Sequence, residues 1–139
     1  MNSQSDEPRW ISKSSALAIY ERLIAEHGGV EGVRDEGSLE AALAAPRNHS
    51  HYARRDFFEP AAAYAFAVTR NHPFLDGNRR LSLTLAGVFL RVNGYRLIGE
   101  EREAIATTIA LANGTIGIEE FAAWLRSNSR RAPRPRKRK

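Results

Sequence analysis

Nine residues with the sequence HPFLDGNRR, at positions 72–80, separate two stretches that both have the pattern of an α-helix. Upstream, Pro60 suits the first turn of a helix, and five alanines between positions 61 and 67 favour that helix strongly. Downstream, large apolar residues recur along positions 81–92, and Gly94 is a stop signal. The sequence therefore predicts helices over about residues 60–71 and 78–93, joined by a short loop.

The same signals predict four further helices. Ser12 is suited to capping a helix over residues 12–27, which Gly28 and Gly29 end, and Pro46 is expected to end a short helix over residues 38–45. Two more helices are expected over residues 100–113 and 118–127, with an extended piece at 95–98 and a loop at 48–56. We therefore predict an all-α fold, a compact single-domain helical bundle with the loop between two central helices.

The composition is that of an ordinary globular domain. The chain has 139 residues, of which 42% are hydrophobic and 27% charged, enough for one domain with a packed core. It has no cysteine, which excludes disulfides and thiolate metal sites. No apolar run approaches the roughly 20 residues that span a bilayer, and residues 1–9 lack the apolar region of a secretory signal. We expect a cytoplasmic protein with no membrane partner.

The positive charge is concentrated at the C-terminus. Residues 130–139 contain seven lysines or arginines and no acid, so the remainder has 14 basic and 16 acidic residues. Such a segment repels itself and has little to bury. We expect a flexible leader at 1–8, a catalytic domain at 9–128 and a disordered basic tail at 129–139. Contact with nucleic acid is expected only through this tail.

The second half of the loop has the groups that bind phosphate. Helix N-termini present unpaired N–H groups and a positive dipole, and Gly77 allows a phosphate to approach the backbone amides. Asn78 has an amide that can cap the helix or bind a phosphate oxygen, and the guanidinium groups of Arg79 and Arg80 match phosphate oxygens. These four residues are the predicted nucleotide-binding set.

The first half of the loop has groups suited to catalysis. His72 can take a proton from an attacking hydroxyl, and Asp76 can hold Mg²⁺ that also binds the phosphates. Phe74 is the expected anchor of the loop in the core. The alternative is that these residues only end one helix and cap the next, but all of them at this spacing favour phosphate chemistry.

The pattern His-x-Phe-x-Asp-Gly-Asn-x-Arg formed by residues 72–80 resembles the signature of the Fic/Doc family. The runs GGVEGVRDEGSLEAAL at 28–43 and LRVNGY at 90–95 are similar to Doc-type (death-on-curing) sequences. The resemblance implies a helical domain in which His72 is the base, Asp76 binds Mg²⁺, and Asn78 and Arg80 hold the phosphates of ATP. It also implies the toxin of a type II toxin–antitoxin system, silenced in trans by the C-terminal segment of an antitoxin, with elongation factor Tu as a target.

Position 79 bears on which group is transferred. Family members that transfer AMP usually have glycine before the final arginine, whereas Doc-type kinases have lysine, and this chain has Arg79. The bulk and charge of Arg79 favour a kinase that moves a phosphoryl group from ATP to a protein hydroxyl. Protein adenylylation remains the alternative, and a non-catalytic nucleic-acid-binding or regulatory partner acting through the basic tail is a second one.

Overall fold

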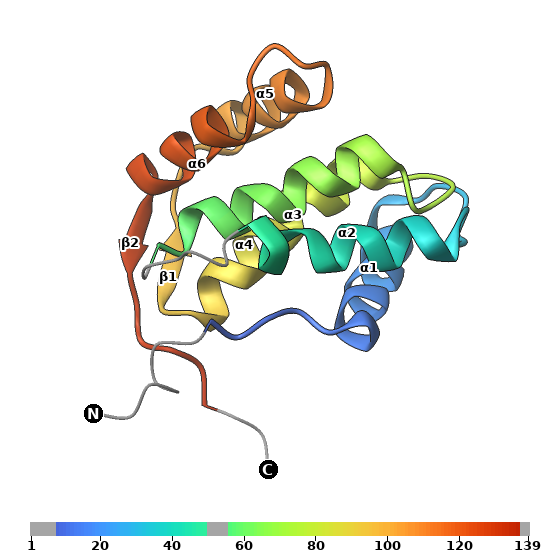
Figure 1. Cartoon of the computed structure of the whole chain (residues 1–139), viewed down its shortest axis with the longest axis horizontal. Coiled ribbons are helices and arrows are strands. Elements are labelled where there is room, and N and C mark those ends of the chain that lie inside the picture. Colours follow the sequence, from blue (N-terminus) through green and yellow to red (C-terminus); the bar gives the residue numbers. More distant parts are fainter. Residues whose placement is uncertain (1–7, 50–55, 137–139) are drawn as a thin grey trace.

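Six helices and a two-stranded sheet make up the described part of the chain, which in this computed structural model is residues 8–49 and 56–136. The elements in order are α1 (Lys13–His27), α2 (Glu36–His49), α3 (Phe58–Asn71), α4 (Asn78–Val92), β1 (Tyr95–Leu97), α5 (Glu101–Ala112), α6 (Ile118–Ser127) and β2 (Ser129–Arg131) (Figure 1). The predicted all-α class is confirmed. No helix in this part of the chain is long and apolar enough to cross a membrane.

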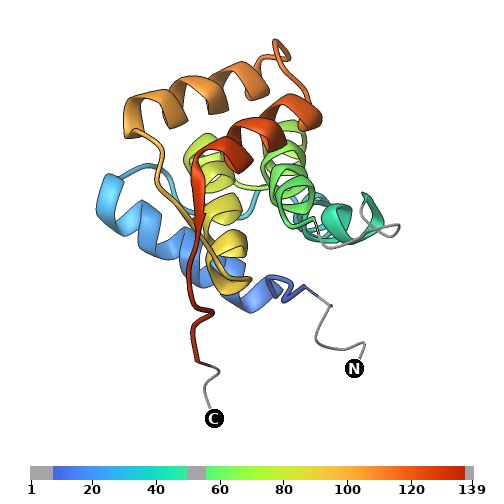
Figure 2. The same cartoon turned by 90° about the vertical axis from the view of Figure 1, so that its left-hand side faces the viewer.

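Helix α3 is the centre of the molecule. Ten of its residues are buried, among them all five of its alanines, and their small side chains let neighbouring helices pack closely. It contacts α2, α4, α5 and α6. Figures 1 and 2 show α5 and α6 together over one side of the α3–α4 pair, with α1 and α2 on the other side. The loop at 72–77 is therefore held between the two helices at the centre of the fold.

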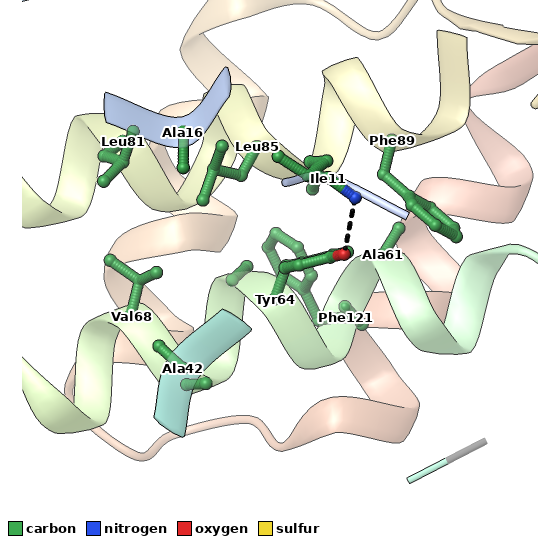
Figure 3. Packing of buried hydrophobic residues seen from close by; sticks show 14 of the residues in the cluster. Ile11, Ala16, Ala42, Ala61, Tyr64, Val68, Leu81, Leu85, Phe89 and Phe121 are labelled. Carbon is green, nitrogen blue, oxygen red and sulfur yellow. Dashed lines mark hydrogen bonds between the residues drawn. The ribbon is translucent and has the colours of Figure 1, made fainter. Parts of the chain in front are cut away.

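The core contains one polar contact that joins the N-terminal segment to α3. Tyr64 is fully buried, and its hydroxyl oxygen accepts a hydrogen bond of 3.0 Å from the backbone N–H of Ile11 (Figure 3). Its ring lies beside that of Phe89, with 5.4 Å between the ring centroids. Burial raises the pKa of Tyr64 above its usual value, because the phenolate would have to be charged inside the core.

Two helices differ from their predicted bounds by two or more residues at an end. Pro46 does not end α2, which continues to His49 with the Pro46 ring buried. An interior proline loses one backbone hydrogen bond and crowds the carbonyl four residues earlier, and burial of the Pro46 ring offsets part of that cost. Helix α3 begins at Phe58, where the Asp56 carboxylate accepts a hydrogen bond of 2.9 Å from the Phe58 N–H. Pro60 still lies in the first turn, where a missing N–H costs nothing.

Residues 129–131 are ordered, although the charge of the segment after α6 predicts a disordered tail. These residues form β2, antiparallel to β1, with Arg96 opposite Arg130 and Leu97 opposite Ser129. Beyond β2, the guanidinium groups of Arg91 and Arg9 donate to the carbonyl oxygens of Pro133 (2.6 Å) and Pro135 (3.1 Å). Charge patterning missed this pairing because the contacts are made by the backbone, whose carbonyls accept from arginine whatever the side chains are. The predicted leader, apart from Pro8, and residues 137–139 lie outside the described residues.

Candidate functional site

The loop between α3 and α4 has left-handed backbone at both of its ends. His72 follows the last residue of α3 and has φ 47° and ψ 59°, the only positive φ of a non-glycine residue in the described chain. Gly77 precedes α4 with φ 81° and ψ 11°. These two residues reverse the chain, so that α4 packs back against α3 and the loop lies at the joined ends of both helices.

Phe74 points into the core, as expected of an anchor. It is buried, and its ring stacks on that of Tyr20 in α1, with 3.8 Å between centroids and 17° between planes. The Tyr20 hydroxyl in turn accepts from the Gly32 N–H at 3.2 Å. Helix α1 and the chain that follows it therefore hold the buried side of the loop in place.

Asn78 closes the loop on itself. Its side-chain oxygen accepts from the Phe74 N–H at 3.1 Å, and its side-chain nitrogen donates to the Phe74 carbonyl at 2.9 Å. Both ends of the amide are thus bonded to one residue of the loop backbone, and one N–H of the amide is left for a ligand. Asn78 is the first residue of α4, and its side chain bonds to the loop instead of capping the helix, so the expected cap is not formed. Its expected contact with phosphate stays a prediction.

Asp76 is exposed, but its carboxylate is held in one orientation. One oxygen accepts from the Gly77 N–H at 2.9 Å and the other from the Val30 N–H at 3.2 Å. Each oxygen keeps a further lone pair, so a cation can bind without breaking either bond. The described residues contain no cluster of three or more acids or histidines. One carboxylate fits Mg²⁺, which commonly takes one or two carboxylates together with substrate phosphates and water.

The three remaining predicted residues are exposed and have free side chains. Neither the imidazole of His72 nor the guanidinium groups of Arg79 and Arg80 contact another described side chain through a hydrogen bond or ion pair. Arg79 and Arg80 lie in the first turn of α4, beside its unpaired N–H groups. The loop thus offers an imidazole, a carboxylate and two guanidinium groups along nine residues, on a backbone fixed at both ends.

The chain that follows α1 also belongs to the site, although its residue types carry no chemical signal of that role. We call residues 29–35 the support segment. Leu75 N–H donates to the Gly32 carbonyl at 2.9 Å, and Arg34 N–H donates to the Pro73 carbonyl at 2.7 Å. Its glycines and the Arg34-Asp35 pair are recognisable in the sequence only as part of a family-like pattern. The support segment is the part of the site that residue chemistry did not predict.

Comparison with known proteins identifies related sequences. Residues 10–90 match the model of the Fic/DOC family. A protein kinase named doc, from Escherichia phage P1, is 34% identical over 119 residues, which cover 85% of this chain and 94% of that protein. Toxin Doc of Mycolicibacterium smegmatis is 38% identical over 77 residues, which cover 52% of this chain and 58% of that toxin.

Proposed function

Since the chain belongs to the Fic/Doc family and is a Doc-like toxin of the transferase class, we propose that it moves a phosphoryl group from ATP to a protein hydroxyl. Mg²⁺ is the proposed cofactor. The observation that supports this most is the loop at 72–80, which brings an unpaired imidazole, an oriented carboxylate and two unpaired guanidinium groups to the junction of α3 and α4.

His72 is the proposed base. The hydroxyl oxygen of the substrate attacks the terminal phosphorus of ATP, the bond from that phosphorus to the bridging oxygen of ADP breaks, and the hydroxyl proton passes to the imidazole. The imidazole is exposed and makes no hydrogen bond within the described residues, so it is free to meet an incoming hydroxyl.

Asp76 and the start of α4 hold the donor in this proposal. Asp76 holds Mg²⁺, and the metal, when bound, neutralises phosphate charge. Gly77, the free N–H of Asn78, and the guanidinium groups of Arg79 and Arg80 bind the phosphates, aided by the positive end of the α4 dipole. Arg80 also stabilises charge that develops during transfer.

A labelling experiment tests the group that is transferred. The purified protein is incubated with a lysate and ATP labelled at either the α or the γ phosphate. We expect γ label on a protein band, and none with His72→Ala or Asp76→Ala at equal abundance. Label from the α position would instead show adenylylation, which Arg79 leaves as the alternative. Undiminished γ labelling by His72→Ala would refute the proposed role of the imidazole.

We propose that an antitoxin is the partner of this chain, which its similarity to Toxin Doc supports. We further propose that the C-terminal segment of the antitoxin binds in trans, that the substrate is elongation factor Tu, and that both act in the cytoplasm, where translation occurs. Purified elongation factor Tu should then take up γ label directly, and an antitoxin encoded beside the toxin should suppress both labelling and growth arrest. Labelling of other lysate proteins but not of elongation factor Tu would refute the proposed target.

Arginines without ion-pair partners support the second alternative, which is binding of nucleic acid. Residues 89–99 and 127–136 contain no acid, and their arginines, with Arg9, form no ion pair with another described residue. Deleting residues 130–139 would also remove most of β2, so substitutions are the cleaner test. If nucleic acid binding is the function, Arg130→Ser/Arg134→Ser should abolish growth arrest, while Arg22→Ser/Arg102→Ser should not. If phosphoryl transfer is the function, both double variants stay toxic.

A further inference from the structure

Arg34 binds three consecutive carbonyl groups where α3 ends and the loop begins. Its guanidinium Nε donates to the His72 carbonyl at 2.6 Å and a terminal nitrogen donates to the Asn71 carbonyl at 2.7 Å. Its own backbone N–H donates to the Pro73 carbonyl at 2.7 Å. No other described side chain makes a hydrogen bond to the backbone of residues 71–73.

These carbonyls need partners. The last four carbonyl groups of an α-helix have no N–H donor within the helix, and the negative end of the helix dipole lies there. A guanidinium supplies several donors in one plane together with a positive charge, so it satisfies neighbouring carbonyls and the dipole at once. Arg34 therefore fixes the last turn of α3 at the residue where the helix stops.

The backbone at His72 makes that contact matter for the site. A non-glycine residue in the left-handed region costs about 1–2 kcal/mol, so the conformation persists only where surrounding contacts impose it. The φ and ψ of His72 set the direction in which its Cβ and imidazole leave the chain. A relaxation of this one residue would turn the ring away from its place relative to Asp76.

We propose that Arg34 is a positioning residue for His72: by binding the Asn71 and His72 carbonyls, it holds the left-handed backbone that aims the imidazole. The inference rests on the proposed function, in which His72 is the base. Arg34 itself touches neither substrate nor nucleotide in this scheme. Its own place is set by the support segment, which is bonded to the loop at Gly32 and at the Arg34 N–H.

The test compares Arg34→Gln and Arg34→Lys with Arg70→Gln. Arg70 is a matched control, because it is an exposed arginine in the last turn of the same helix that lies over the Phe66 ring at 5.0 Å instead of binding carbonyls. Both glutamine variants remove one positive charge near the same dipole end. Steady-state γ-phosphoryl transfer gives kcat and the KM for ATP, and thermal unfolding with circular dichroism reports whether each variant is folded.

We expect Arg34→Gln to lower kcat roughly 10- to 100-fold, since a misplacement of about 1 Å in a reacting group costs about 100-fold. The KM for ATP should stay within about twofold, because the proposed phosphate ligands lie at the other end of the loop. Arg34→Lys should lose a large part of the same activity although it keeps the charge, because one ammonium does not reproduce the planar pair of donors. Arg70→Gln should behave as wild type.

The inference is overturned if folded Arg34→Gln keeps the kcat of Arg70→Gln, or if its KM for ATP rises in proportion to the loss. If Arg34→Gln does not fold, Arg34→Lys decides by the same criteria. A failure of the proposed function looks different, because the wild type itself would then transfer no γ-phosphate, or His72→Ala would transfer it as fast as the wild type. Loss of activity in His72→Ala together with full activity in both Arg34 variants would refute the positioning role alone.

Discussion

A methyl group added at Gly29 should disturb the proposed metal ligand without touching the rest of the loop. Gly29 has φ +120°, and a Cβ placed there would lie 2.9 Å from the Asp76 carboxylate oxygen Oδ2 and 3.3 Å from Ile24 Cδ1. Ordinary contact begins near 3.4 Å, so the carboxylate must move by about 0.5 Å. Its hydrogen bond from the Val30 N–H is already 3.2 Å long, and a shift of that size away from Val30 would break it.

Gly28 is the matched control for Gly29→Ala. It has φ +85°, and a Cβ placed there meets nothing within 4 Å. Gly28→Ala and Gly29→Ala both place an alanine at positive φ, at a cost of about 1–3 kcal/mol each, but only Gly29→Ala displaces the carboxylate. Thermal unfolding of the two variants measures this cost, and the remaining difference reports on Asp76.

The expected result is a loss of transfer activity in Gly29→Ala of roughly tenfold relative to Gly28→Ala. That figure scales the cost of about 100-fold for a misplacement of 1 Å to half that distance. The assay is γ-phosphoryl transfer across a magnesium titration, in which Gly29→Ala should need more Mg²⁺ for half-maximal rate. If folded Gly29→Ala matches Gly28→Ala within about twofold at every Mg²⁺ concentration, the support segment does not orient Asp76.

Four further predictions concern stability. Tyr64→Phe should lower the free energy of unfolding by about 1–3 kcal/mol in urea titrations, because it leaves the Ile11 N–H buried without an acceptor; no change would show that water replaces the hydroxyl. In the wild type, the raised pKa of Tyr64 predicts stability that is intact below about pH 10 and falls as pH rises through the folded pKa, whereas Tyr64→Phe should lack this loss. Hydrogen bonds from the Ser38 hydroxyl and from the backbone N–H groups of Ser38 and Gly37 lower the pKa of Asp35. The stability that Asp35 contributes is therefore present above about pH 4 and is lost as pH falls through the folded pKa. Asp35→Asn should reduce this loss of stability in acid, and an unchanged loss would contradict the prediction. Phe74→Ala should cost about 3–5 kcal/mol by emptying the space beside Tyr20, and a loss under about 1 kcal/mol in chemical denaturation would exclude an anchoring role.

Most of the helices could be predicted from local signals. Ser12 accepts a hydrogen bond from the Ser15 N–H as a cap should, α4 begins at Asn78 as expected, and α6 occupies the expected residues 118–127. Caps, glycine stops and apolar periodicity are properties of neighbouring residues, so they can be read along the chain. The first misjudged end was at Pro46, where burial against other helices decided the outcome.

The contacts around the loop could not be predicted in the same way. The loop residues were identifiable because their side chains have distinctive chemistry. Apart from the Arg34 guanidinium, the support segment holds them through backbone carbonyls and amides about 40 residues away in sequence. Every residue except proline offers the same donor and acceptor there, so no residue type marks the pairing. The pairing of β2 with β1 was missed for the same reason.

The described ends of the chain meet beside the small sheet, where Arg9 bonds to the Pro135 carbonyl. The loop lies at the opposite end of α4, whose 15 residues span about 22 Å. A fluorophore or surface tether attached at Arg9 or Pro135 would thus lie remote from the loop, and one at each position would bring two reporters together. Immobilised this way, the protein would present its loop outward to a macromolecular substrate.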